Sequence, residues 1–191
     1  MEKARLKTFS LCFQTLIIQP LNPTLYAQEN ANQLKSYSYY LNAGVGGSWL
    51  APNQGAISTG VSVCYFDGKN LYSIRYVRNL ELKLNRGSCP SEEGVLDIGL
   101  MYGRASKSSY GVASASAGLG LVHGSRCAWD YSTGQNRYTD ERFYTVGIPV
   151  EIQLSWTPTS FFGLGIIAFA DLNLQQSFAG GLLSITFGSI N

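Results

Sequence analysis

Residues 144–156 read YTVGIPVEIQLSW, and the alternation within this stretch decides the fold. Its even-numbered positions are all apolar or aromatic, from Tyr144 through Val150 to Trp156, and its odd-numbered positions are small or polar. Side chains alternate between two faces only in a β-strand, so the stretch is predicted to be a long strand with one apolar face. Because Pro149 has no N–H for the ladder, we expect a β-bulge just before Glu151.

The same period of two continues along the chain on both sides of this stretch. Turn signals separate the alternating segments, among them Asp67-Gly68, which favours a tight hairpin. The longest segment without the alternation, from His123 to Arg142, is predicted to be irregular. The pattern predicts eight strands, at about residues 38–49, 57–65, 72–83, 96–103, 113–121, 144–156 and 162–172, with the last strand ending at 187.

Composition limits the class of protein. The chain has 191 residues, enough for one domain with a substantial core. Its 14 lysines and arginines nearly balance its 12 acidic residues, which gives no reason to expect nucleic acid as a partner. We predict no metal and no cofactor.

Residues 1–27 resemble a secretory signal peptide. An apolar run at 9–18 follows three basic residues, which are Lys3, Arg5 and Lys7. We therefore predict a signal peptide at 1–27, a short extension at 28–35 and the folded domain at 36–191. No later stretch approaches the ~20 uninterrupted apolar residues of a membrane helix, so any contact with a bilayer would be made by strands.

Alternation alone does not show whether the apolar face points into a core or out into lipid. Three features favour lipid. The strands are longer than those of most soluble sheets, and the polar face is rich in Gly and Ser, which suits the crowded lumen of a small barrel. Aromatic residues also occur at one end of every strand, as in the girdles of membrane barrels; they are Tyr39, Tyr65, Tyr72, Tyr102, Tyr110, Trp156, Phe162 and Phe187.

Trp49, Tyr144 and Phe178 occupy the opposite strand ends. The predicted fold is an all-β, eight-stranded antiparallel up-and-down transmembrane β-barrel, whose closure satisfies every backbone group. A soluble secreted β-barrel that binds a lipophilic ligand is the alternative fold-level interpretation.

The chain resembles the small Gram-negative outer-membrane β-barrels of the OmpA/OmpX-like superfamily. The resemblance covers residues 36–191 and rests on the signal segment, the eight amphipathic strands, Phe187 and the run Gly147-Ile148-Pro149-Val150-Glu151. It implies export to the outer membrane, contact with outer-membrane lipid, and a structural, surface-binding or adhesion role without catalysis. A monomer is the favoured state. The chain departs from the usual ending, because four residues follow the last aromatic and the final one is Asn191.

Four charged residues fall on the lumenal face of the predicted barrel. They are Arg75, Asp97, Glu151 and Asp171. Unpaired charges would be costly there, so we expect them to pair, with Arg75 and Glu151 bridging the lumen as a plug. A gate or an ion path is the alternative. Arg78 falls instead on the apolar face and is expected near the outer interface, where it could reach anionic lipid heads.

Two cysteines, Cys89 and Cys127, fall in the second and third outer loops of this topology. Outside the cytosol such a pair can oxidise, so a disulfide between the loops is our hypothesis. The predicted loop at 124–142 is also a candidate surface for a ligand or protein partner, with a solvated cap over the barrel mouth as the alternative.

His123 and Ser125 are two residues apart and can share one face of a strand. Histidine is the commonest general base and serine a nucleophile, and Glu141 lies beyond the predicted loop. The pair weakly resembles the His-x-Ser pair of outer-membrane lipid A deacylases. A lipid A-modifying hydrolase is therefore the alternative function, against the simpler interpretation of His123 as a loop residue.

Overall fold

The computed structural model describes residues 37–52, 54–82, 94–130 and 137–189, all within the compact unit Lys35–Asn191. Side chains are described for these residues except at 37, 126–130 and 137–140. Within this part of the chain there is no helix with the length and apolarity needed to span a bilayer.

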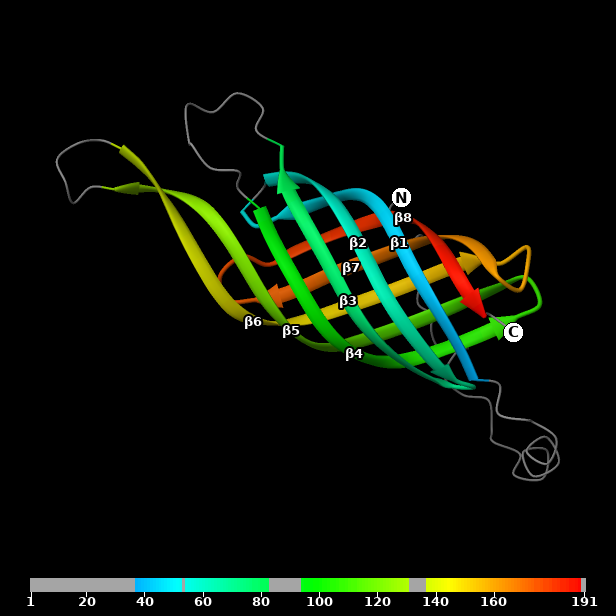
Figure 1. Cartoon of the computed structure of the whole chain (residues 1–191). Coiled ribbons are helices and arrows are strands. Elements are labelled where there is room, and N and C mark those ends of the chain that lie inside the picture. Colours follow the sequence, from blue (N-terminus) through cyan, green and yellow to red (C-terminus); the bar gives the residue numbers. More distant parts are fainter. Residues whose placement is uncertain (1–36, 53, 83–93, 131–136, 190–191) are drawn as a thin grey trace, which may run out of the picture. The chain divides into compact units, whose positions relative to one another are not determined.

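Eight antiparallel strands form a closed barrel in which each strand pairs with the next and β8 pairs with β1 (Figure 1). The predicted fold class is confirmed. The strands are β1 (Tyr37–Leu50), β2 (Gln54–Asp67), β3 (Asn70–Glu81), β4 (Gly94–Ser108), β5 (Gly111–Asp130), β6 (Arg137–Trp156), β7 (Phe162–Asn173) and β8 (Phe178–Ser189).

The apolar face of each strand points outward and the polar face points into the barrel. On β6, Leu154 is 60% exposed whereas its neighbour Gln153 is 1% exposed. Gly, Ser and other polar residues therefore line the interior, and Val, Ile and Leu form the outer surface. This arrangement is the reverse of that in a water-soluble domain, where large apolar side chains are buried.

The predicted aromatic girdle surrounds one end of the barrel, here called the girdle end. Its members face outward, and several contact one another across neighbouring strands, with ring centroids 4.9 Å apart for Tyr39 and Tyr65 and 5.3 Å apart for Tyr72 and Tyr102. Phe178 lies at the opposite strand end, as expected, but it does not face outward. That ring is 3% exposed and packs edge-on against Phe169 inside the barrel, because Phe178 has the parity of the lumenal residues of β8.

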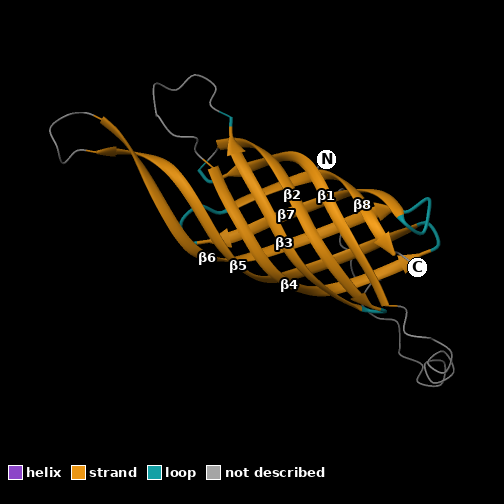
Figure 2. Ribbon diagram, viewed as in Figure 1, coloured by secondary structure: helices purple, strands orange, loops and turns teal. Residues whose placement is uncertain are grey.

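The opposite end is called the hairpin end, because β5 and β6 extend there beyond their neighbours (Figure 2). The pairing of β4 with β5 stops at Gly94 and Ser125, and the pairing of β6 with β7 stops at Gly147 and Asn173. Beyond these points the two strands pair with each other as far as Asp130 and Arg137, and with no other strand that the structure describes.

The prediction of an irregular segment from His123 to Arg142 is therefore wrong, as are the loop bounds of 124–142. Both arms of this segment are strand, and only residues 131–136 lie outside the described part. Two strands that extend beyond the barrel bury no continuous apolar face, so the period-two signal disappears although the backbone stays extended.

The expected bulge at Pro149 is also absent. Ala117 pairs with Val150 and Gly120 with Gly147, in the same register, so neither strand contains an extra residue. The β5–β6 ladder is instead interrupted for two pairs, while the β6–β7 ladder runs straight through Pro149. The proline ring fills the lumen beside two glycines. A Cβ on Gly99 would lie 3.0 Å from its Cγ, and one on Gly120 would lie 3.4 Å from its Cδ.

Candidate functional site

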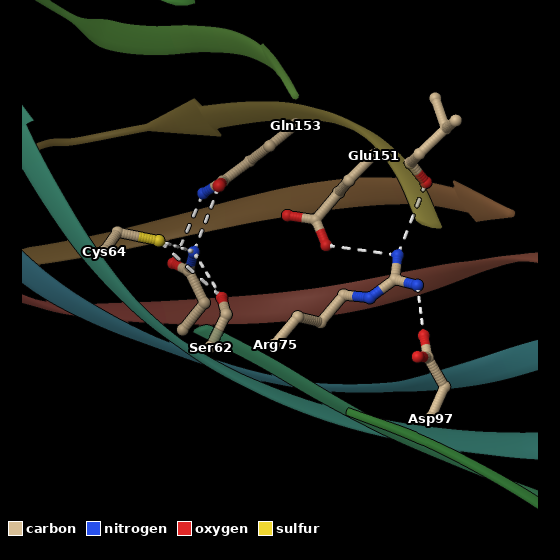
Figure 3. Close-up of polar contacts among 8 residues, drawn as sticks. Ser62, Cys64, Arg75, Asp97, Glu151 and Gln153 are labelled. Carbon is tan, nitrogen blue, oxygen red and sulfur yellow. Dashed lines mark hydrogen bonds and ion pairs between the residues drawn. The ribbon is translucent and has the colours of Figure 1, made fainter. Parts of the chain in front are cut away.

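The lumenal charges lie on four strands, β3, β4, β6 and β7, and all point inward. Arg75, Asp97 and Asp171 are at most 1% exposed and Glu151 is 6% exposed. Arg75 occupies the centre of the group (Figure 3): its Nη2 donates to Asp97 Oδ2, and its Nη1 donates to the Val150 carbonyl at 3.3 Å. The same Nη1 lies 3.7 Å from Glu151 Oε2. The structure thus brings Arg75 and Glu151 together, with Asp97 as the nearer partner.

Asp171 is held by a neighbour other than Arg75. Asn173 Nδ2 donates to its Oδ1 at 2.7 Å. Gly147 on the adjacent strand makes room for this carboxylate, since a Cβ there would lie 2.3 Å from Asp171 Oδ1. Asp97 Oδ1 and Asp171 Oδ2 have no hydrogen-bond partner among the described residues.

A second polar group lies between these charges and the girdle end. The side-chain amides of Asn42 and Gln153 exchange two hydrogen bonds across the lumen, at 3.0 and 3.2 Å. Thr186 donates to Asn42 Oδ1 at 2.7 Å, and Gln153 donates to Ser155 at 2.7 Å. Our sequence reasoning missed this group because it followed only charged residues. Strand parity alone would have identified Asn42 and Gln153 as large polar side chains inside the barrel.

Apolar side chains close the lumen at the hairpin end. The cluster includes Leu50, Val95, Val122, Phe143 and Phe178, all of them 7% exposed or less. A smaller cluster of Tyr40, Cys64, Phe66 and Leu71 lies near the girdle end. Side chains therefore fill the described interior along its length. Apolar side chains occupy the hairpin end, ion pairs the middle, and hydrogen-bonded polar side chains the part toward the girdle end, as expected for a barrel of eight strands.

The candidate catalytic residues are on the projecting hairpin. His123 and Ser125 share the outward face of β5, and the His123 ring stacks on Tyr144 with centroids 4.4 Å apart. Glu141 has the parity of the buried Phe143 and so belongs to the other face of the hairpin. The strand geometry therefore does not place this acid where it would orient His123, as a catalytic triad requires.

The remaining predicted residues have simpler positions. Cys89 and the side chain of Cys127 lie outside the described residues, so the disulfide between them stays a prediction. Cys64 is a buried free thiol. Arg78 is exposed on the outward face of β3, between Thr59 and Leu96 of the neighbouring strands.

No family model and no curated protein matches the chain. Solved structures do. The crystal structure of Neisserial surface protein A (NspA) superposes with a TM-score of 0.55 at 13% identity, covering 81% of this chain and 97% of that one. The chain has the fold of the small outer-membrane β-barrels.

Two structures of Ail, the attachment invasion locus protein of Yersinia pestis, support the same assignment. One superposes with a TM-score of 0.53 at 11% identity, covering 81% of this chain and 98% of that one. The other, in complex with the heparin analogue sucrose octasulfate, has a TM-score of 0.56 at 10% identity, covering 80% and 99%. At these identities the likeness concerns the fold alone.

Proposed function

We propose that this protein is an integral outer-membrane β-barrel that exposes a binding hairpin at the cell surface and catalyses no reaction. The observation that carries the proposal is the inverted distribution of side chains. Apolar residues such as Leu100 (66% exposed) and Leu183 (70% exposed) form a continuous outer surface between the girdle and the hairpin. In water such a surface would promote aggregation, whereas in a bilayer it contacts acyl chains.

The orientation follows from the girdle and from the connections. The short turns at 68–69 and 109–110 lie at the girdle end, as periplasmic turns do. At the hairpin end, the connections at 51–53 and 174–177 are also short. The difference in connection length between the two ends therefore depends on residues 82–93 and 131–136. In this orientation the hairpin of β5 and β6 projects from the cell.

The hairpin supports a surface-binding role. The ladder between β6 and β7 begins at Gly147. From Arg137 to Val146, the edge of β6 that faces away from β5 therefore has no partner strand among the described residues. An edge of this kind offers N–H and C=O groups to an extended segment of another protein, a common mode of recognition. The Ail structure with a heparin analogue shows that a barrel of this fold can bind an anionic ligand. For the present chain a surface ligand or protein partner is part of the proposal.

Export and oligomeric state complete the proposal. Residues 1–27 serve as the signal peptide, and the barrel inserts as a monomer. The soluble lipophile-binding barrel is less well supported, because the described lumen is occupied by its own side chains.

The test is expression of the full chain in a Gram-negative host, followed by membrane fractionation. We expect the protein in the outer-membrane fraction, extracted only by detergent, with gel migration that changes on boiling because the folded barrel resists the detergent. Mass spectrometry of the purified protein should show loss of residues 1–27. Recovery in the aqueous fraction without heat-modifiable migration would contradict the proposal and favour the soluble barrel.

A further inference from the structure

A hollow of about 480 Å³ lies on the outward face of the barrel, toward the hairpin end. Its size falls within the range of ligand sites, roughly 300–1,000 Å³. Three strands form it: Leu96 and Ile98 come from β4, Leu121 and His123 from β5, and Tyr144 and Val146 from β6. Its walls are almost entirely apolar, and the polar side chains that line it, those of His123, Tyr144 and Thr145, belong to β5 and β6 at the end nearer the hairpin.

Basic side chains flank that polar end. The register aligns Arg78, Leu96, His123 and Tyr144 side by side on four consecutive strands, all on the outward face. Two residues before Tyr144 on β6, toward the tip of the hairpin, Arg142 has the same outward parity and is exposed. Arg78 therefore lies beside the hollow and Arg142 lies beyond its hairpin end, whereas Glu141 belongs to the opposite face of the hairpin.

His123 lines the hollow, and its Nε2 is buried without a hydrogen-bond partner among the described residues. A buried polar atom without a partner is costly, and a ligand with a polar group could satisfy it. Together, these features describe a site for an amphiphile, with an apolar trough along the barrel and a cationic, hydrogen-bonding end near the predicted membrane surface.

We propose that this hollow binds a membrane lipid of the outer leaflet, with one acyl chain along Leu96, Leu121 and Val146 and its phosphate at Arg142 and Arg78. Guanidinium groups bind phosphate by paired, charge-assisted hydrogen bonds, so a phosphorylated head group matches this end of the hollow. The inference rests on the proposed membrane insertion and adds a specific lipid contact to it.

A second outward hollow provides an internal comparison. It has a volume of about 660 Å³ and lies at the girdle end, where Tyr72, Leu100, Ala117 and Leu119 contribute to its lining. Neither hollow has Lys or Arg in its lining, but the second also has no lining side chain with a buried polar atom that lacks a partner, as His123 has in the first. Leu119 and Leu121 are two residues apart on β5, have the same outward orientation and are 68% and 69% exposed. They form a matched pair, one for each hollow.

The test uses the full chain in detergent micelles, with lipid binding measured by native mass spectrometry. The probes are dimyristoyl phosphatidic acid and dimyristoylglycerol, which differ only in the phosphate. We expect phosphatidic acid to bind at least about tenfold more tightly, since a charge-assisted hydrogen bond contributes ~1.5–3 kcal/mol. R142Q should remove most of that preference, and L121W, which fills the hollow, should weaken binding of both lipids.

Two variants serve as controls. R104Q removes an exposed cation near the girdle end, and L119W alters the other hollow, so neither should change the binding of phosphatidic acid. Equal affinity for the two probes would overturn the inference, as would an R104Q effect as large as that of R142Q or an L119W effect as large as that of L121W. A parallel transfer into phosphatidylcholine nanodiscs separates the two proposals: failure to insert overturns both, and insertion without phosphate preference overturns the lipid site alone.

Discussion

Arg75 provides the positive charge that two buried carboxylates, Asp97 and Glu151, face in the middle of the lumen. Removing one member of a buried ionic group costs more than the group contributes when it is intact, because the remaining charges lose their partner and have no water to replace it. The interior is therefore most sensitive at this residue.

We expect R75M to lower the free energy of unfolding by about 3 to 5 kcal/mol, the range for breaking a buried pair. E151Q should cost less, because Glu151 is the more distant partner of Arg75 at 3.7 Å and an amide oxygen can still accept a hydrogen bond. Urea unfolding from lipid vesicles, followed by tryptophan fluorescence, measures both. An R75M protein as stable as the E151Q protein would contradict the central role of Arg75.

Gly147 is a second sensitive residue, for a steric reason. A Cβ there would lie 2.3 to 2.6 Å from three atoms of the Asp171 carboxyl group, which is fully buried and so has little freedom to move. We expect G147A to destabilise the barrel by about 1 to 3 kcal/mol, as overpacked cores do. G55A is the matched control, since a Cβ at Gly55 meets nothing within 4 Å. The same unfolding assay should show no measurable loss for G55A, and equal losses would contradict the steric explanation.

At the scale of the elements, the hairpin of β5 and β6 is separable from the barrel. Its strands beyond Ser125 and Arg142 pair only with each other, so no other described strand depends on them. Replacing residues 126–141 with an Asn-Gly turn should leave heat-modifiable migration unchanged, since this dipeptide favours a two-residue hairpin.

The same deletion should abolish any binding of host-surface protein or polysaccharide that the intact protein shows in a cell-adhesion assay. Deletion of the β7–β8 turn at 174–177 would be a poor control, because Ser177 accepts a hydrogen bond from Ala51 and joins two turns. A barrel that no longer folds without residues 126–141 would show that the hairpin is structural.

The strands also show which features of the fold can be predicted from the sequence and which cannot. Strand number and the inward and outward faces followed from the period of two, because burial of one face of a strand produces that alternation in the sequence. The ends of β5 and β6 were not predictable in this way, since a projecting hairpin has no buried face. Pro149 was misjudged because its accommodation depends on Gly99 and Gly120 from two other strands, and pairing between strands is not visible in a local pattern.

At the scale of the whole molecule, the filled lumen predicts an impermeable barrel. Apolar side chains at the hairpin end, ion pairs in the middle and hydrogen-bonded polar side chains toward the girdle end occupy the described interior. We expect no discrete conductance steps in planar bilayers, and no release of small sugars from vesicles that contain the protein. Reproducible steps that disappear in R75M would instead support the gate interpretation of the lumenal charges.

Closure of the barrel joins the first strand to the last, with Tyr39 opposite Ser189. Contacts between residues so far apart in sequence are slow to form, because the entropy of closing the intervening chain is lost before the contact stabilises anything. A barrel that lacks this final seam would expose two unpaired strand edges to lipid, where each unsatisfied backbone group is costly. Synthesis and translocation of the entire chain must therefore precede stable insertion, and an exported but unfinished chain would be a substrate for holding chaperones and proteases.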